Sequence, residues 1–301
     1  MHRLATWQLF AVCVLTWGTT WHAVTYQLSD LAPEFGVALR FALAGGLVLA
    51  YCAASGRWPR LGAGDHALLA LQGSFLYGVS YVCVYHAERF VASGLVAVGY
   101  SASPLIAGIG ARLLFKIPVS GRFLAGGAIG LAGIALIFWP ELRRPTTDDR
   151  TMTGVLLTVA SVLLSSVGAL TASRNRHHGI GLLPAMGWGM VYGAAAAALV
   201  AVVLGRSVAV PAAASWWISL AYLALAGSVL TFACFLTLQD RIGPGPTGTI
   251  GVMTPLLALV VSLLLEGFRP AALTAVGAFL AIAGNVLMLR PARVTLRPAR
   301  A

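Results

Sequence analysis

The chain contains one long segment twice, and this internal repeat limits its possible folds more than any other feature. Residues 94–140 read GLVAVGYSASPLIAGIGARLLFKIPVSGRFLAGGAIGLAGIALIFWP, and residues 245–291 repeat this pattern of glycine and proline 151 positions later. The offset aligns Gly94 with Gly245, Pro104 with Pro255, Gly126 with Gly277, Gly133 with Gly284, and Pro140 with Pro291. An ungapped register of this length indicates a duplicated unit. We therefore predict two homologous domains, residues 1–145 and 146–301.

The composition is that of a chain dissolved in lipid. Hydrophobic residues make up 59% of the 301 residues and charged residues 10%, and the mean hydropathy is +0.86. Soluble domains carry about 25% charged residues, so this chain could not cover its own surface in water. Its net charge of +11 comes from basic residues scattered between apolar runs, which is typical of membrane flanks. We expect the lipid bilayer, and no nucleic acid, as a partner.

The apolar runs predict an all-α polytopic membrane protein with ten transmembrane helices. A membrane-spanning helix needs roughly 20 mostly apolar residues. Ten segments qualify: 7–26, 34–54, 66–87, 93–115, 120–139, 153–175, 183–204, 216–238, 246–265 and 270–290. Five helices per half make the second half enter the membrane inverted relative to the first. Inverted repeats are a transporter architecture, with the substrate near the midplane and alternating access between the halves.

The basic residues predict the orientation, because cytoplasmic loops carry an excess of Lys and Arg. With a cytoplasmic N-terminus, thirteen of the 20 Lys and Arg residues lie inside, six lie outside, and Arg40 lies within a span. We predict a multi-pass protein of the cell inner (plasma) membrane with both termini in the cytoplasm. The connection at 141–150 runs against the bias, since its three arginines would lie outside.

Each half also resembles the EamA-type repeat of the drug/metabolite transporter superfamily. The residues that carry the resemblance are Pro33, Arg40 and Phe41 in the second helix, Pro104 or Pro255 in the fourth, Glu266 eleven residues later, and a Gly-rich fifth helix. Phe115 and Lys116 stand where the first half would carry the acidic residue, and Val191 stands where the second half would repeat Arg40. The resemblance implies a cavity among helices 1–4 and 6–9, with helices 5 and 10 peripheral. It also implies export of small metabolites, with amino acids, aromatic ones among them, prominent.

Aromatic residues with polar groups lie near the middle of two predicted helices. Tyr77, Tyr81 and Tyr85 are four residues apart and share one helix face, as do Trp17 and Trp21. A buried phenol or indole N–H needs a hydrogen-bond partner. We predict that Trp17, Tyr77 and Tyr81 line a substrate cavity, with packing between helices as the alternative. Tyr85, and Trp21 with it, fit the aromatic belt at the membrane–water interface.

The two aligned prolines mark a further candidate region. Tyr100 and Ser103 precede Pro104, and a proline inside a helix frees a backbone carbonyl one turn earlier. We predict helix breaks at Pro104 and Pro255, with Tyr100 and Ser103 as substrate contacts. The alternative is a kink whose carbonyl is satisfied by neighbouring hydroxyls.

Two small-residue patterns favour helix packing. Thr158, Ser161 and Ser165 form a polar stripe on the sixth helix, and packing is its favoured role, although Ser165 stays a candidate substrate contact. Gly126 and Gly130 are small residues four positions apart, as are Gly277 and Ala281, and this pattern predicts close packing of helices inside the protein. We expect a monomer or a weak homodimer.

Arg40 is the basic residue that lies clearly within a predicted span. An intramembrane Arg costs at least ~2.5 kcal/mol on insertion scales, which makes it a functional candidate. It could bind a substrate carboxylate, brace a gate, or extend to the outer headgroups.

The acidic residues bear on the energy source. All nine fall at helix ends or in loops, whereas proton-driven transporters usually carry a midspan carboxylate or histidine. His22 and His86 lie nearer the outer end. We therefore expect transport without obligatory proton coupling.

These observations predict a membrane transporter that exports small amphipathic metabolites, with bulky apolar or aromatic amino acids the favoured cargo. We expect no enzyme activity, no metal and no cofactor. A multidrug or cation exporter is one alternative, which a midspan carboxylate would favour. An intramembrane enzyme is another, and it would need clustered His, Asp, Glu or Cys at membrane depth.

Overall fold

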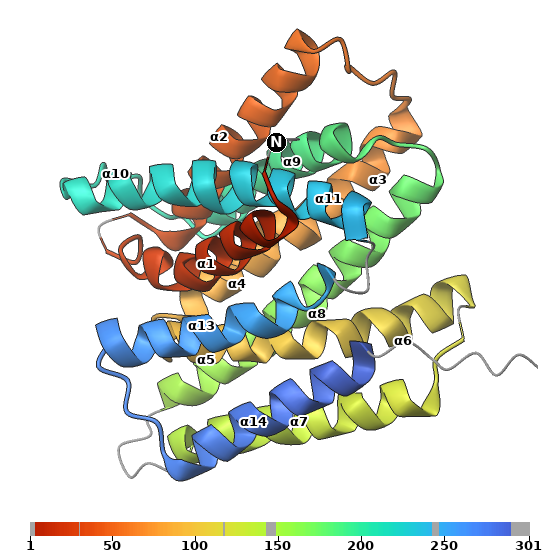
Figure 1. Cartoon of the computed structure of the whole chain (residues 1–301). Helices are drawn as coiled ribbons and strands as arrows, with labels where there is room; N and C mark the ends of the chain where they lie inside the picture. The colour runs from red at the N-terminus through yellow and green to blue at the C-terminus, as the bar shows by residue number, and fades with distance from the viewer. Residues whose placement is uncertain (1–3, 30, 117, 143–148, 243–246, 290–301) are drawn as a thin grey trace, which may run out of the picture.

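The computed structural model describes residues 4–29, 31–116, 118–142, 149–242 and 247–289, and all regular structure within these ranges is helical (Figure 1). The first half contains α1 (Thr6–Thr25), α2 (Pro33–Ala54), α3 (Ala63–Gly73), η1 (Ser74–Gly78), α4 (Val79–Ala87), α5 (Ser93–Gly99), η2 (Tyr100–Ala102), α6 (Ser103–Phe115) and α7 (Gly121–Leu142). The second half contains α8 (Asp149–His177), α9 (Leu182–Val203), α10 (Ala214–Ala221), η3 (Tyr222–Leu230), α11 (Thr231–Ile242), α13 (Ile250–Leu265) and α14 (Ala272–Leu289). The predicted domain boundary at 145–146 falls outside the described residues.

The helices confirm an all-α chain suited to a membrane. Eight helical runs in the described ranges are long and apolar enough to cross a bilayer, and α13 is a shorter apolar helix. The first predicted span corresponds to α1, a helix of 20 residues that is not among these eight runs. Large apolar side chains face outward, such as Leu113 and Val203 at 75% exposure each. This exposure requires an apolar surrounding.

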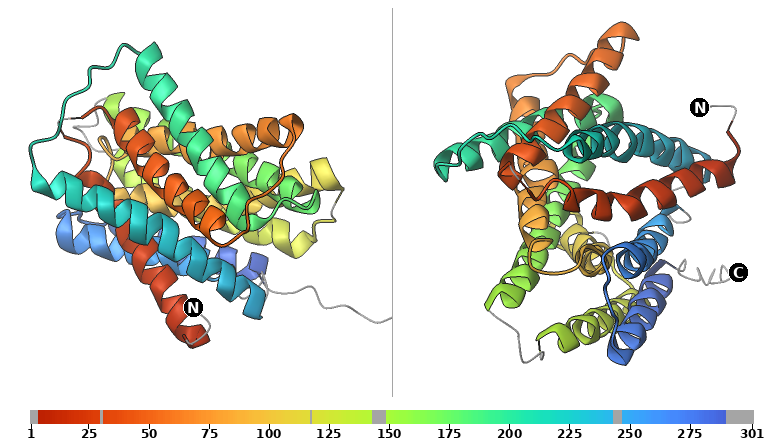
Figure 2. Two further views of the ribbon diagram at one scale, coloured as in Figure 1. Left: turned by 90° about the horizontal axis from the view of Figure 1, so that it is seen from above. Right: turned by 90° about the vertical axis from the view of Figure 1, so that its left-hand side faces the viewer.

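Helices of the two halves pack in matching pairs. The helix pairs α2 with α9 and α7 with α14 each join equivalent positions of the repeat. In addition α1 packs on α13 and α11, and its repeat equivalent α8 packs on α6 and α4. Figures 1 and 2 show α7 and α14 side by side at one edge of the molecule, away from α2 and α9. The peripheral position expected for the fifth and tenth helices is therefore confirmed.

Glycines allow α7 and α14 to approach closely, as the sequence predicted. A Cβ at Gly133 would lie 2.5 Å from the Gly277 carbonyl oxygen, and a Cβ at Gly277 would lie 2.5 Å from the Gly133 carbonyl oxygen. Gly126 faces Gly284 in the same reciprocal way. At the 151-residue offset Gly133 is equivalent to Gly284, and Gly277 is equivalent to Gly126. The Gly133–Gly277 and Gly126–Gly284 contacts are therefore equivalent, and this seam follows the symmetry of the repeat.

This seam gives the first testable prediction. Gly133→Ala should destabilise the protein by about 1–3 kcal/mol, because the new methyl group meets backbone that cannot move aside. Gly130→Ala is the matched control on the same helix, since its Cβ would have 4.0 Å to its nearest neighbour atom. Thermal unfolding in detergent should show a lower Tm for Gly133→Ala alone. Equal Tm values for the two variants would contradict the close seam.

Two π-helical segments interrupt the third and eighth membrane helices at equivalent places. The segment η1 begins at Ser74, and 151 residues on lies Leu225, within η3. A π segment shifts hydrogen bonds by one residue and leaves backbone carbonyls for other partners. In η3 the Gly227 carbonyl accepts a hydrogen bond from the Trp17 indole at 3.0 Å. The sequence analysis did not foresee these segments.

Candidate functional site

A cavity of about 290 Å³, here called the central cavity, lies between helices of both halves. Seven predicted site residues line it: Trp17, Arg40, Tyr81, Tyr100, Ser103, Pro104 and Pro255. Its other lining residues are Thr20, Trp21, Val24, Val84, Ala97, Phe232, Gly251 and Thr254. The walls are therefore mostly aromatic and apolar, with few polar groups, which is the usual character of a small-molecule site.

Arg40 of α2 is the charged side chain among the residues that line the central cavity. It is 3% exposed, and its guanidinium lies 5.0 Å from the Tyr81 ring centroid and 5.1 Å from that of Phe41. Its Nε donates to Ser228 Oγ at 3.4 Å. The alternative in which Arg40 extends to the outer headgroups does not fit this structure, because aromatic faces and a hydroxyl hold the cation inside the bundle.

Aromatic contacts fix Trp17 and Tyr100 in the cavity wall. The Trp17 ring lies 5.1 Å from Phe232 and at a steep angle to it. Tyr100 lies 5.2 Å from Trp21, centroid to centroid. The buried hydroxyl of Tyr100 lies near those of Ser161 and Ser165 but makes no hydrogen bond of good geometry, and neither does that of Ser103. Two buried hydroxyl groups near the cavity wall thus lack a hydrogen-bond partner in the described part of the chain.

The placement of Trp21 and Tyr85 at the membrane–water interface is wrong. Trp21 lines the central cavity. Tyr85 is fully buried, and its hydroxyl donates to Gln27 Oε1 at 3.0 Å. The reason is tertiary, since α2 and α8 both pack on α4 and cover the turn that a lone helix would present to lipid.

Tyr77 and Ser165 lie outside the central cavity. Tyr77 is 5% exposed, lies 5.3 Å from Phe41 between ring centroids, and lines a second cavity. Ser165 is buried and donates to the Val162 carbonyl of its own helix at 3.1 Å. Thr158 and Ser161 bond their own helix in the same manner, which favours packing as the role of this stripe.

The two prolines differ in their surroundings. Pro104 follows the short 3-10 segment η2, so the helix tightens just before it. Pro255 lies inside α13 without a break in the helix. Both line the central cavity, which places the interrupted backbone of the first half beside the site.

Three of the eight lining residues that the sequence analysis missed follow from the repeat itself. At the 151-residue offset Phe232 is the equivalent of Tyr81, Thr254 of Ser103, and Gly251 of Tyr100. The alignment that paired Pro104 with Pro255 could have found all three. The cavity is therefore built in part from the same positions of both halves.

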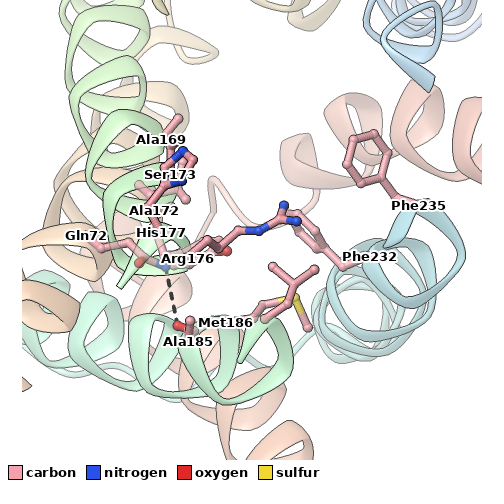
Figure 3. Close-up of a pocket in the computed structure, with 13 residues that line it drawn as sticks. Gln72, Ala169, Ala172, Ser173, Arg176, His177, Ala185, Met186, Phe232 and Phe235 are labelled. Atoms are coloured by element: carbon pink, nitrogen blue, oxygen red, sulfur yellow. Dashed lines mark hydrogen bonds between the residues drawn. The ribbon is translucent and has the colours of Figure 1, made fainter. Parts of the chain in front are cut away.

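The second cavity, here called the vestibule, has a volume of about 540 Å³ and lies at the helix ends that carry Arg176. It is lined by Gln72, Leu76, Tyr77, Ala169, Ala172, Ser173, Arg176, His177, Leu182, Ala185, Met186, Phe232 and Phe235 (Figure 3). Phe232 belongs to both cavities. One aromatic ring therefore stands between the central cavity and the vestibule.

Ionisable groups gather at the opposite helix ends, here called the Glu88 end. Glu34 is buried, and its Oε1 lies 3.0 Å from His86 Nε2 and 3.3 Å from Arg206 Nε. Glu266 Oε1 lies 3.0 Å from His22 Nδ1. Sequence reasoning placed these carboxyl groups at helix ends correctly, but their burial depends on helices that meet only in the folded chain.

Hydrogen bonds also tie Glu266 to the first half. Ser93 donates its hydroxyl at 2.5 Å and its backbone N–H at 3.1 Å, and Ser262 donates at 2.9 Å. Burial raises the pKa of Glu266, but the hydrogen bonds from Ser93, His22 and Ser262 outweigh it and leave this pKa below its ordinary value. Glu266 is therefore ionised at neutral pH and links α13 to α5 at this end.

Glu88 has no comparable partner in the described part of the chain. It is 8% exposed and both carboxyl oxygens are buried without a hydrogen bond. Burial and the nearby charge of Glu266 raise the pKa of Glu88 well above its usual range, although Arg40 opposes the shift. A neutral, protonated carboxyl group suits this site best.

Comparison with known proteins places the chain in a family. Protein PecM of Dickeya dadantii is 26% identical over 87% of this chain and 84% of its own length. An uncharacterized inner membrane transporter of Escherichia coli K12, YedA, is 28% identical over 86% of this chain and 82% of its own. Protein PagO of Salmonella typhimurium is 22% identical, and the match spans 56% of this chain and 54% of PagO.

The fold and the family profile agree with these relatives. A solved crystal structure superposes with a TM-score of 0.65 over 93% of this chain and 94% of that one, at 17% identity. The profile of the EamA-like transporter family matches twice, at residues 5–139 and 152–290. The two matches cover nearly the whole chain, one in each half, and so the protein belongs to the EamA-like transporter family.

Proposed function

We propose that this protein exports small amphipathic metabolites, with bulky apolar or aromatic amino acids as the preferred cargo. The observation that carries the proposal is the central cavity, where one buried arginine faces a wall of Trp17, Tyr81, Tyr100 and Phe232. A carboxylate binds the guanidinium through charge-assisted hydrogen bonds. The aromatic faces receive an apolar side chain, and each such stacking contact contributes ~0.5–1.5 kcal/mol.

Transport would proceed by alternating access between two inverted repeats. Matching helix pairs and the reciprocal glycine seam support a two-fold relation between the halves. Five helices per half would make the second half enter the membrane inverted relative to the first. The two-fold axis would then lie in the membrane plane. The central cavity uses equivalent residues of both halves, such as Tyr81 and Phe232, which supports a site on the axis.

The present conformation fits one state of such a cycle. The vestibule lies at the Arg176 end, while His22, His86 and three carboxyl groups are packed together at the Glu88 end. If both termini are cytoplasmic, as the basic residues predict, the vestibule lies on the cytoplasmic side. An exporter loads its cargo from that side.

A multidrug or cation exporter is supported less well. Among the described residues, the lining of the central cavity contains Arg40 and no acidic residue. A cation would meet an arginine of the same charge in a poorly hydrated site, which is unfavourable. We therefore favour cargo with a carboxylate.

Efflux from proteoliposomes tests this function. We expect the wild type to release tryptophan, phenylalanine and leucine faster than glycine, glutamate or a tetraalkylammonium cation. Tyr81→Ala should slow tryptophan efflux by about 2–10-fold, because one aromatic contact of ~0.5–1.5 kcal/mol is lost. Tyr51→Ala is the matched control, since Tyr51 lies on the outer face of α2 at 54% exposure.

The outcome that contradicts the proposal is equally clear. Fast efflux of the cation alone would favour the multidrug reading. Equal tryptophan efflux from the Tyr81→Ala and Tyr51→Ala variants would remove Tyr81 from the substrate site.

A further inference from the structure

The vestibule has features of a binding site that the central cavity does not explain. It is larger than the central cavity, at about 540 Å³ against 290 Å³. Three aromatic residues, Tyr77, Phe232 and Phe235, line the vestibule, and Phe232 also lines the central cavity. Arg176 and His177, at the end of α8, line it as well. Apolar and cationic groups therefore face the same space.

Arg176 is oriented into this space. Figure 3 shows its side chain extending from α8 across the vestibule toward Phe232. Within the described ranges it has no ion pair or hydrogen bond, so its guanidinium donors are free to meet a ligand. A planar guanidinium with free donors is well suited to a carboxylate.

The wall beneath Arg176 is held in place by a buried amide network. Asn175 Nδ2 donates to Gln72 Oε1 at 2.8 Å, and Gln72 Nε2 donates to the Ala185 carbonyl at 3.3 Å. Asn175 and Gln72 are nearly fully buried. The network joins α3, α8 and α9 next to Arg176, which reduces the freedom that a bound ligand would have to remove.

We propose that the vestibule is a second substrate station, in which Arg176 binds the carboxylate of the cargo and Tyr77, Phe232 and Phe235 contact its apolar side chain. This proposal rests on the proposed function, because it assumes cargo with one carboxylate and one apolar group. It repeats the chemistry of the central cavity, an arginine opposite aromatic rings, at a more hydrated position. Phe232 contacts both stations, and its movement would pass the cargo from the vestibule to Arg40.

The substitution Arg176→Gln tests the carboxylate contact. We expect the KM for tryptophan efflux to rise about fivefold with little change in maximal rate, since a partly hydrated ion pair is lost. Tryptamine, which keeps the indole ring and lacks the carboxylate, should be moved equally by the variant and the wild type. Arg176→Lys should recover part of the affinity, because it keeps the charge without the planar donor pair.

Arg174→Gln is the matched control. Arg174 lies on the same helix, is exposed like Arg176, and is absent from the vestibule wall. Loss of one positive charge near the membrane surface affects both variants alike. The proposal requires the KM for tryptophan to rise in Arg176→Gln and not in Arg174→Gln.

The outcomes separate this proposal from the proposed function. If the wild type moves tryptophan and both glutamine variants share its KM, the second station is wrong and the proposed function stands. Equal losses for tryptophan and tryptamine in Arg176→Gln would also overturn the station, since they indicate a structural role. If the wild type moves no carboxylate-bearing solute, both proposals are wrong.

Discussion

Replacing Arg40 with glutamine should reduce tryptophan export by about 10–100-fold, because a hydrogen bond to a charged group contributes ~1.5–3 kcal/mol. Arg40 is buried, and its guanidinium is the cationic group at the central cavity. Without it a substrate carboxylate would enter a poorly hydrated space with no opposite charge. The measurement is initial efflux of labelled tryptophan from proteoliposomes that contain equal amounts of folded protein.

Two comparisons separate substrate binding from a structural role for Arg40. Arg40→Lys keeps the charge but loses the planar group over the Tyr81 and Phe41 rings, so we expect an intermediate rate. Tryptamine is a cation that Arg40 disfavours, so its slower efflux should not fall in Arg40→Gln. A loss of the same size for both solutes would show that Arg40 supports the fold or a gate and does not bind the carboxylate.

Raising the pH should open the Glu88 end. Burial and the charge of Glu266 hold the pKa of Glu88 well above its usual range in this closed arrangement, whereas water in an open state would return it to roughly 4.3. The bound proton therefore stabilises the closed state. That stabilisation is complete below the ordinary pKa of a glutamate and is lost as pH rises through the raised value.

Between the ordinary and the raised pKa of Glu88, the ratio of open to closed molecules rises about tenfold per pH unit, because opening releases one proton. The surrounding charged and titratable groups are Arg40, Glu266 and Tyr85, with the Glu34 and His22 pairs next to them and Arg150 at the start of α8. Glu88→Gln resembles the protonated form, so it should hold this end closed at every pH.

Spin labels at Ser29 and Pro270, which are exposed at this end, would report the opening as a longer distance. The long-distance fraction should grow with pH in the wild type and stay low in Glu88→Gln. Asp65→Asn, at the opposite helix ends where Asp65 caps α3, should keep the wild-type response. A wild type without pH response, or an unchanged response in Glu88→Gln, would show that Glu88 does not control this end.

This burial bears on the expectation of transport without proton coupling. That expectation rests on the positions of the acidic residues along the sequence, and Glu88 does lie at a helix end, directly after α4. In the fold the same helix end is covered by neighbouring helices, so Glu88 is buried without being midspan. The structure thus offers a proton-binding group that position along the chain does not reveal.

Features that repeat along the chain could be predicted, and features made by contact between distant helices could not. The duplication, the apolar runs and the residues around Pro104 depend on local spacing and lead directly to helices and to most of the central cavity. Trp21 and Tyr85 were misplaced because spacing gives a residue's depth along a helix and not the neighbours that cover it. The Glu34–His86 and Glu266–His22 contacts join residues 52 and 244 positions apart, which no local pattern indicates.

The most direct test of the account concerns access to the central cavity from both sides of the membrane. Ser103 lines this cavity, so Ser103→Cys in a chain without its four native cysteines reports whether the cavity is open. We predict that a membrane-impermeant thiol reagent modifies this cysteine from either side, and that tryptophan slows modification from both. Modification from one side only under all conditions, or rates that tryptophan does not change, would contradict alternating access at this site.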